Sequence, residues 1–221
     1  MLKIRCSSIG KIMTNSRSKT ETLSKTCRTY LQELAVEEMY GKRKEFSSKY
    51  TDKGNQVEDD GIKLCESVLD LGFMYKNEEH FTNDFLTGTP DVNTDIILDV
   101  KSSWDATTFP FFAEDIPNKD YFYQLQGYMA LTGKRKSYLC YCLINTPELM
   151  VEDEVRRAHW KENLIDESEE LRNHVEAQHN FDNIPTERRI KTFEVRYDKD
   201  VVKAIYDRVK ECREYYQTLI L

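Results

Sequence analysis

The sequence lacks several features that would assign it at once to a class of protein. It contains no apolar run of about 18 residues, which argues against a transmembrane helix and a membrane partner. Its opening segment, Met1–Thr14, lacks the apolar region of a secretory signal. None of the six cysteines forms a Cys-x-x-Cys pair, and no GxxxxGK[ST] motif is present. Zinc fingers, disulfide scaffolds and P-loop motors are therefore disfavoured, and a reduced, cytoplasmic setting is expected.

Glycine and proline are also scarce, with 8 and 5 residues in a chain of 221, and no linker rich in them divides the sequence. No internal repeat or low-complexity segment is visible either. A single domain over residues 1–221 is expected. It would comprise N-terminal helices (1–72), a central sheet with a helix (73–145) and a C-terminal elaboration (146–221).

Charge is distributed unevenly along the chain, whose net charge is −7. Residues 1–50 hold 11 Lys and Arg against 5 Asp and Glu, whereas the remainder holds 21 against 34. A basic face on an acidic body suits a protein that touches phosphate on one side only. The alternative interpretation is an ordinary solvated helix surface.

Hydrophobic periodicity predicts an α/β fold with a mixed central sheet flanked by helices. Helices are expected at 6–16, 20–41, 50–71, 119–133, 147–178 and 199–221, and strands at 73–81, 84–90, 95–103, 136–145 and 188–198. Residues 93–95 would turn the chain between the 84–90 and 95–103 strands. The charged region 147–178 could be a partner-binding arm or a solvated outer layer, and the outer layer is favoured.

Two acids and a lysine stand out in the segment GTPDVNTDIILDVKSSW, Gly88–Trp104. The period of two along a strand places Asp99 and Lys101 on one face, and the turn brings Asp91 back toward Asp99. Two carboxylates that close repel each other unless a proton or a cation lies between them. A hard divalent cation would satisfy them; an exposed ion pair on a surface hairpin is the alternative.

Two flanking helices could complete such a site. Glu58 follows the apolar Val57 on the helix before the sheet, and Gln124 and Tyr128 share a face of the helix after it because they are four residues apart. A solvated Gln and a half-buried Tyr on an amphipathic helix would have the same spacing.

In this order, Glu58, Pro90-Asp91, Asp99-Val100-Lys101 and Gln124-x-x-x-Tyr128 resemble the PD-(D/E)XK nuclease superfamily. The trailing Gln-x-x-x-Tyr places the likeness in its RecB-type and lambda-exonuclease-type branch. The opening SSIGKIMT is similar to the start of phage-encoded, YqaJ-like recombination exonucleases. The likeness spans roughly residues 5–145, and the seven-residue gap between Asp91 and Asp99 is at the short end for the family.

The resemblance implies a restriction-endonuclease-like core and a role for each motif residue. Asp91 and Asp99 would hold Mg²⁺, or Mn²⁺ in its place, with the Val100 carbonyl and Glu58 completing the shell. Lys101, either with its pKa lowered by burial or as a positioned cation, would orient the attacking water. Gln124 and Tyr128 would position the scissile phosphate or the lysine. Because the late cysteine group of the cluster-bearing CRISPR nucleases is missing, no iron–sulfur cluster is expected.

The same resemblance suggests how DNA would be bound. Ser8, Lys11 and Arg17 would help bind a terminal 5′ phosphate, while Ser102 and Ser103 would touch the DNA backbone. Trp104 would stack on a base, unless it packs under the edge of the sheet. The implied partners are double-stranded DNA ends, a single-strand annealing protein and further copies of the chain in a trimeric ring.

The sequence therefore favours a Mg²⁺-dependent DNA exonuclease that resects duplex ends from 5′ to 3′ in phage-type recombination and repair. A structure-specific or general endonuclease of the same fold is the alternative among enzymes. The alternative from another class is a non-catalytic DNA-binding or assembly protein. Juxtaposed acids beside anionic DNA argue against that third reading.

Overall fold

A computed structural model describes residues 1–44, 47–164 and 166–220. Its α-helices are α1 (Ile9–Ile12), α2 (Lys25–Tyr40), α3 (Lys49–Val68), α4 (Lys119–Thr132), α5 (Glu148–Lys161), α6 (Glu169–His179) and α7 (Lys199–Ile220). Its strands are β1 (Ile4–Arg5), β2 (Phe81–Thr82), β3 (Leu86–Gly88), β4 (Val92–Asn93), β5 (Ile97–Ser102), β6 (Lys136–Cys142) and β7 (Ile190–Arg196). Short 3₁₀ turns cover Cys6–Ser8 and Thr186–Arg188. Two positions in the expected helices, Ile165 and Leu221, lie outside the described residues.

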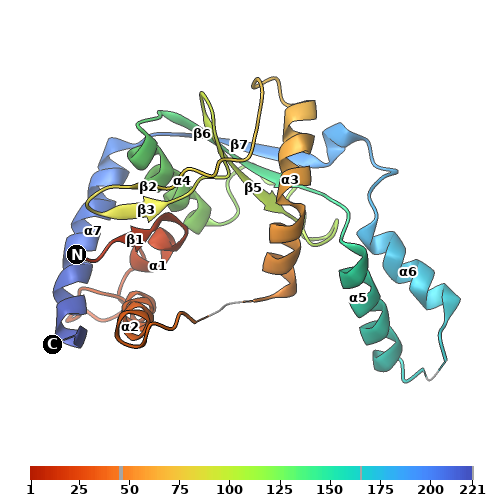
Figure 1. The fold of residues 1–221 in the computed structure, drawn as a ribbon, viewed down its shortest axis with the longest axis horizontal. Coiled ribbons are helices and arrows are strands. Elements are labelled where there is room, and N and C mark those ends of the chain that lie inside the picture. Colours follow the sequence, from red (N-terminus) through yellow and green to blue (C-terminus); the bar gives the residue numbers. More distant parts are fainter. Residues whose placement is uncertain (45–46, 165, 221) are drawn as a thin grey trace.

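A four-stranded sheet in the order β4-β5-β6-β7 forms the centre of the molecule (Figure 1). The two middle strands, β5 and β6, run parallel, and each outer strand is antiparallel to its neighbour. The expected mixed sheet flanked by helices is therefore confirmed. Helices cover both faces of the sheet, and Ile97, Leu98, Asp99 and Val100 of β5 are all buried.

The two faces of β5 carry different helices. Ile97 joins a core cluster built from α1, α2, α4 and α7, whereas Leu98 and Val100 join a second cluster beneath α3. The helix α3 lies so close to the strand that a Cβ on Gly61 would sit 2.7 Å from Val100 Cγ1. A glycine at this position allows the close approach.

The N-terminal helices form where they were expected, but the 6–16 helix is reduced to α1 and a 3₁₀ turn, and the 20–41 helix begins only at Lys25. The Ser24 side chain accepts the Cys27 N–H at the start of α2, and Gly41, with φ of 62°, ends the helix. Cys27, Tyr30, Leu31 and Ala35 of α2 are buried and Leu34 is half-buried, whereas Met39 is 54% exposed. Ser8 immediately precedes α1, and its side chain makes no capping hydrogen bond.

One strand pairing was predicted wrongly. The 84–90 segment contains β3, which pairs with β1 and β2 in a separate three-stranded sheet rather than with β5. The partner of β5 is the two-residue strand β4, which begins directly after Asp91. The expected 73–81 strand is also shortened to β2 at its end. Asp91 reaches β5 all the same, because β4 turns back onto it.

The helices α5 and α6 pack on each other and extend to one side of the sheet (Figure 1). Their surfaces are mostly polar, with Val155, Val175 and His179 as the buried positions. This arrangement is a helical arm rather than the outer layer that the sequence favoured. Across the described part of the chain, no helix combines the length and the apolar character that crossing a membrane requires.

Candidate active site

Asp91 and Asp99 meet at the start of the β4–β5 hairpin. The side chain of Asp99 is fully buried on the α4 face of β5. Asp91 Oδ2 accepts the Val100 N–H at 2.7 Å, which holds its carboxylate against the strand that carries Asp99. Burial, followed by repulsion from the Asp99 charge, raises the pKa of Asp91 to about 7. The structure thus brings together the two acids that the sequence predicted as neighbours.

Lys101 lies beside this acid pair. Its Nζ is 2.6 Å from Asp99 Oδ2 and 5.1 Å from the centre of the Tyr121 ring, and the side chain is 24% exposed. Burial alone would lower the pKa of Lys101, but the Asp99 and Asp91 carboxylates outweigh it and hold that pKa above its usual range. Of the two expected forms of this lysine, the structure favours the positioned cation over a lysine of lowered pKa.

Gln124 and Tyr128 project from α4 toward the buried carboxylate. Gln124 Nε2 donates to Asp99 Oδ1 at 2.8 Å and to the Tyr128 hydroxyl oxygen at 3.1 Å. Burial, together with the two aspartate charges, raises the pKa of Tyr128, so its hydroxyl stays protonated. The spacing of four residues therefore places both side chains at the site, where Gln124 contacts Asp99 and Tyr128 contacts Gln124.

Glu58 is the least engaged of the predicted acids. It lies on α3, is 25% exposed and forms an ion pair with Lys76 at 3.3 Å. Its charge still contributes to the raised pKa of Asp91, which places it near the pair. Within the described residues, no three Asp, Glu, His or Cys side chains converge closely enough to enclose a metal ion.

The donor set nevertheless suits a hard divalent cation. It consists of two carboxylates and the Val100 carbonyl, and Mg²⁺ commonly takes only one or two carboxylates besides water. Asp99 Oδ2 is buried and has no aligned hydrogen-bond donor among the described residues, although the Lys101 charge lies close to it. The raised pKa of Asp91 is a further sign that negative charge here is only partly compensated.

The segment after β5 is fixed by a residue that the sequence reasoning missed. Lys53 of α3 is fully buried, and its Nζ donates to the carbonyl oxygens of Ser103 and Trp104 at 2.8 and 2.9 Å. Desolvation lowers the pKa of Lys53 to about 8. Lys53 continues the buried stripe of Val57, Gly61 and Leu64 at helical spacing, and that pattern could have revealed it.

The residues of this segment that were predicted to contact DNA are mostly buried in the structure. The hydroxyls of Ser102 and Ser103 are buried and without hydrogen-bond partners among the described residues. Trp104 is only 7% exposed. Its ring packs against Tyr50 and His179, and Lys49 Nζ lies 4.5 Å from its centre. Trp104 is therefore packed inside the protein, and its ring is not free to stack on a base.

Ser8 and Lys11 line a basic cavity of about 290 Å³ between α1 and α2, and the other lining residues are Arg5, Tyr30, Glu33, Leu34, Glu37, Arg43 and Lys44. Lys11 Nζ lies 5.1 Å from the centre of the Tyr30 ring. The Tyr30 hydroxyl is buried and has no partner among the described residues. Arg17 is exposed and does not line this cavity.

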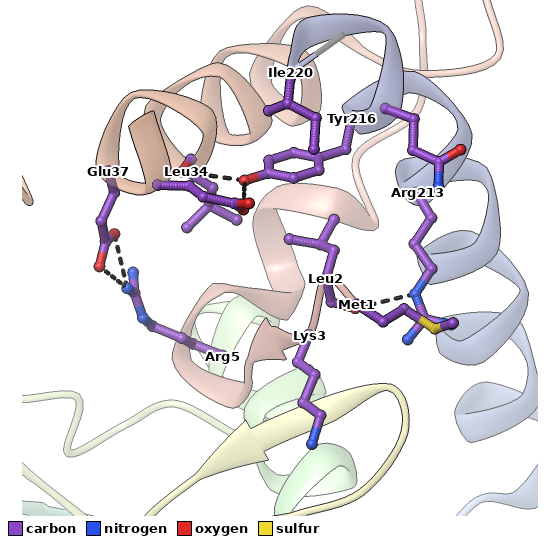
Figure 2. A pocket seen from close by; sticks show the side chains of 11 residues that line it. Met1, Leu2, Lys3, Arg5, Leu34, Glu37, Arg213, Tyr216 and Ile220 are labelled. Carbon is purple, nitrogen blue, oxygen red and sulfur yellow. Dashed lines mark hydrogen bonds and ion pairs between the residues drawn. The ribbon is translucent and has the colours of Figure 1, made fainter. Parts of the chain in front are cut away.

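A neighbouring cavity of about 550 Å³ lies between α2, α7 and the N-terminal segment (Figure 2). Arg5 and Glu37 line both cavities and form an ion pair at 2.6 Å. On the opposite side, Arg213 Nε donates to the Leu2 carbonyl at 3.0 Å. The acid pair of β5 does not contribute to this larger cavity, which is therefore separate from the candidate chemistry.

Comparisons with known proteins follow this geometry. Neither a scan against protein-family models nor a search of curated proteins found a match. Among solved structures, the chain is similar to a phage-related exonuclease from Haemophilus somnus 129PT, with 31% identity, a TM-score of 0.79 and coverage of 99% of this chain and 95% of that one.

A second similarity is to the alkaline exonuclease LHK-Exo of Laribacter hongkongensis, with 15% identity, a TM-score of 0.65 and coverage of 99% and 89%. The complex of LHK-Exo with dAMP aligns with 16% identity and the same TM-score of 0.65. At this level of identity the likeness concerns the fold, and it agrees with the restriction-endonuclease-like core that the sequence predicted.

Proposed function

This chain belongs to the family of phage-related exonucleases, and on that premise we propose that it is a metal-dependent enzyme that hydrolyses phosphodiester bonds from the ends of duplex DNA. The observation that carries the proposal is the group of Asp91, Asp99 and Lys101, two acids and a cation that meet on the central strand β5 with Asp99 fully buried. A binding module would gain nothing from two carboxylates beside anionic DNA, because they repel its phosphates.

Asp91, Asp99 and the Val100 carbonyl would hold a Mg²⁺ or Mn²⁺ ion, with Glu58 as a further ligand if it leaves Lys76. When bound, such an ion lowers the pKa of a coordinated water and neutralises charge on the phosphate. The oxygen-only donor set and the raised pKa of Asp91 support this assignment.

The chain's own residues would supply orientation and charge. Lys101, a positioned cation 2.6 Å from Asp99, would orient the attacking water and stabilise negative charge that develops on the phosphate. Gln124 would hold the Asp99 carboxylate in one orientation, and Tyr128 would hold Gln124. This buried chain of hydrogen bonds fixes the geometry before the substrate arrives.

The basic cavity supports recognition of a duplex end. Lys11, Arg43 and Lys44 line a concave site next to Ser8, and such a group suits a terminal 5′ phosphate. Binding the terminal phosphate there would set a 5′ to 3′ direction of hydrolysis. The exposed Arg17 would contact DNA outside this cavity, if it contacts DNA at all.

The biological setting is a further part of this proposal. We propose that the enzyme resects DNA ends for recombination and repair in the cytoplasm of a bacterial host. Its partner would be a single-strand annealing protein, and its active form a ring of three copies. A ring would turn the basic N-terminal face toward DNA and leave the acidic remainder outside.

Digestion of three duplex DNAs tests the function: linear with 5′ phosphates, linear after dephosphorylation, and circular, each with Mg²⁺ and beside an Asp99→Asn control. We expect loss of linear DNA alone, slowed by dephosphorylation and abolished in the variant. Cleavage of the circle would indicate an endonuclease instead. Equal inactivity of wild type and variant with Mg²⁺ and with Mn²⁺ would leave a DNA-binding protein.

A further inference from the structure

A row of three side chains crosses the central sheet at the level of the candidate catalytic lysine. Lys101 of β5 pairs in register with Tyr141 of β6, and Tyr141 pairs with Lys191 of β7. Side chains at paired positions point to the same face of a sheet. Because neighbouring strands lie about 4.8 Å apart, the two lysines start about 10 Å from each other on that face.

Aromatic rings fill the spaces along this row. Tyr121 of α4 lies 5.1 Å from Lys101 Nζ and packs edge-to-face against Tyr141, with ring centres 6.3 Å apart. Phe193 continues the series 6.1 Å beyond Tyr141, and Lys191 Nζ lies 5.5 Å from the centre of the Phe193 ring. The result is a continuous strip of three aromatic rings with a lysine at each end, which holds the two cations on one face of the sheet.

The two lysines of this strip differ in whether a carboxylate pairs with them. The Lys101 ammonium is paired with Asp99, whereas within the described part of the chain no carboxylate lies within ion-pair distance of Lys191. Lys191 and Tyr141 are both partly exposed. Burial raises the pKa of Tyr141 to about 12, so its hydroxyl remains a hydrogen-bond donor at neutral pH. The strip therefore ends in an unused positive charge next to an available hydroxyl.

We propose that Tyr141 and Lys191 form a second phosphate-binding position, which holds a non-scissile phosphate of the DNA strand whose scissile phosphate lies at Lys101. This inference rests on the proposed nuclease function and extends it, because the site assigns the enzyme a preference for a polynucleotide over a small phosphodiester. Lys191 would act as a point charge and Tyr141 as a hydrogen-bond donor to the same phosphate. A lysine whose stem merely covers Phe193 while its ammonium stays in water is the opposing interpretation.

The test compares two substrates in wild type and in Lys191→Gln, with Mg²⁺ and in parallel with Mn²⁺. One substrate is a 5′-phosphorylated linear duplex, and the other is bis(p-nitrophenyl) phosphate, a small diester that cannot reach a second phosphate position. Lys210→Gln is the matched control, because Lys210 is a surface lysine of α7 paired with Asp207. We expect the ratio of DNA to small-diester hydrolysis to fall about tenfold in Lys191→Gln and to stay at the wild-type value in the control.

Binding gives a second readout that does not need hydrolysis. In an Asp99→Asn background, affinity for a fluorescent duplex oligonucleotide is measured from low to high salt. Loss of one phosphate contact should reduce the slope of log affinity against log salt by about 0.9 in the Lys191→Gln variant. Tyr141→Phe should weaken binding by a smaller factor and leave the slope intact.

The outcomes separate the two proposals. An unchanged substrate ratio together with an unchanged salt slope in Lys191→Gln would overturn the second phosphate position and leave the nuclease intact. A wild type that hydrolyses neither substrate would remove the proposed function. In that case a reduced salt slope would still support Lys191 as a phosphate contact, and an unreduced slope would overturn it.

Discussion

The two faces of β5 show how one strand can serve chemistry and anchorage at once. On the α4 face, beyond the buried Ile97, Asp99 and Lys101 meet Asp91 and Gln124 in a group of charged and polar side chains. On the α3 face, Leu98 and Val100 pack into an apolar cluster. The strand's period of two separates these roles, so the apolar α3 face anchors the strand that carries the charged groups on its other face.

The lysines that flank the strand end sharpen this contrast. Lys101 lies among carboxylates and its pKa is raised, whereas Lys53 meets carbonyl oxygens and aromatic rings and its pKa is lowered to about 8. Burial acts in the same direction on both ammonium groups. The pKa of Lys101 is raised because two carboxylates lie beside it on the α4 face. The pKa of Lys53 is lowered because those carboxylates are too far from it to offset its burial.

The largest expected effect comes from removing the positive charge of Lys101 on the α4 face of β5. Lys101→Met should lower the rate of duplex hydrolysis by about 10²–10⁴-fold, the usual range for a group that orients or deprotonates an attacking water. Because the change leaves the buried Asp99 carboxylate without its cation, a circular dichroism spectrum is needed to establish that the variant is folded. Single-turnover digestion of a linear duplex measures the effect. Lys63→Met, which removes an exposed charge from α3, is the control and should retain full activity.

Two glycines of α3, Gly54 and Gly61, test how closely this helix packs on the other face of β5. A Cβ at Gly61 would lie 2.7 Å from Val100 Cγ1, whereas a Cβ at Gly54 would meet nothing within 4 Å. Both changes to alanine gain the same helix propensity, so Gly61→Ala should be less stable than Gly54→Ala by about 1–3 kcal/mol, the cost of overpacking. Urea unfolding measures the difference. Equal stabilities would mean that α3 moves away from β5 without cost.

The lysine on the packed face predicts a dependence on pH. Between pH 8 and 10.5 the unfolded chain keeps a proton that folded Lys53 has released, so rising pH stabilises the folded wild type. The Lys53→Met variant has no titrating group at this position, so rising pH cannot stabilise it in this way. The stability of the wild type over the variant should therefore grow by about 2 kcal/mol between pH 7 and pH 10. Urea unfolding at both pH values measures it, and Lys63→Met should show a constant gap to wild type.

The smallest expected effect is a gain in the stability of the folded protein when the charge of Asp91 is removed. Because the folded-state pKa of Asp91 is raised to about 7, the folded protein loses stability as pH rises from about 4 to 7 in the absence of metal. Asp91→Asn removes this penalty. With EDTA at pH 8.5 the variant should be more stable by about 1 kcal/mol, a figure reduced for the partial exposure of Asp91. A thermal melt of both proteins checks it, and at pH 4 the difference should vanish.

Local periodicity was enough to predict much of the site. Alternation along β5 placed Asp99 and Lys101 on one face, and the spacing of four residues placed Gln124 and Tyr128 together on α4. The end of α2 at Gly41 also follows from local chemistry. These features depend on neighbours within one element, which the sequence displays directly.

Features that depend on distant contacts were predicted less well. The pairing of β3 with β1 joins segments about eighty residues apart, and no local pattern distinguishes it from pairing with β5. Trp104 was expected at DNA as one of two readings, but its environment is set by Lys49 and His179 from other elements. Lys53 was overlooked because a lysine is rarely fully buried, although it lies on the apolar stripe of its helix.

Titration of Mn²⁺ into the protein by calorimetry, in wild type and in Asp91→Asn, tests the central claim that Asp91 and Asp99 form a cation site on β5. We expect saturable binding in wild type, and we expect the variant to lose it while its circular dichroism spectrum stays native. Identical binding isotherms for the two folded proteins would contradict the assignment. The acid pair would then be a buried charge cluster without a metal.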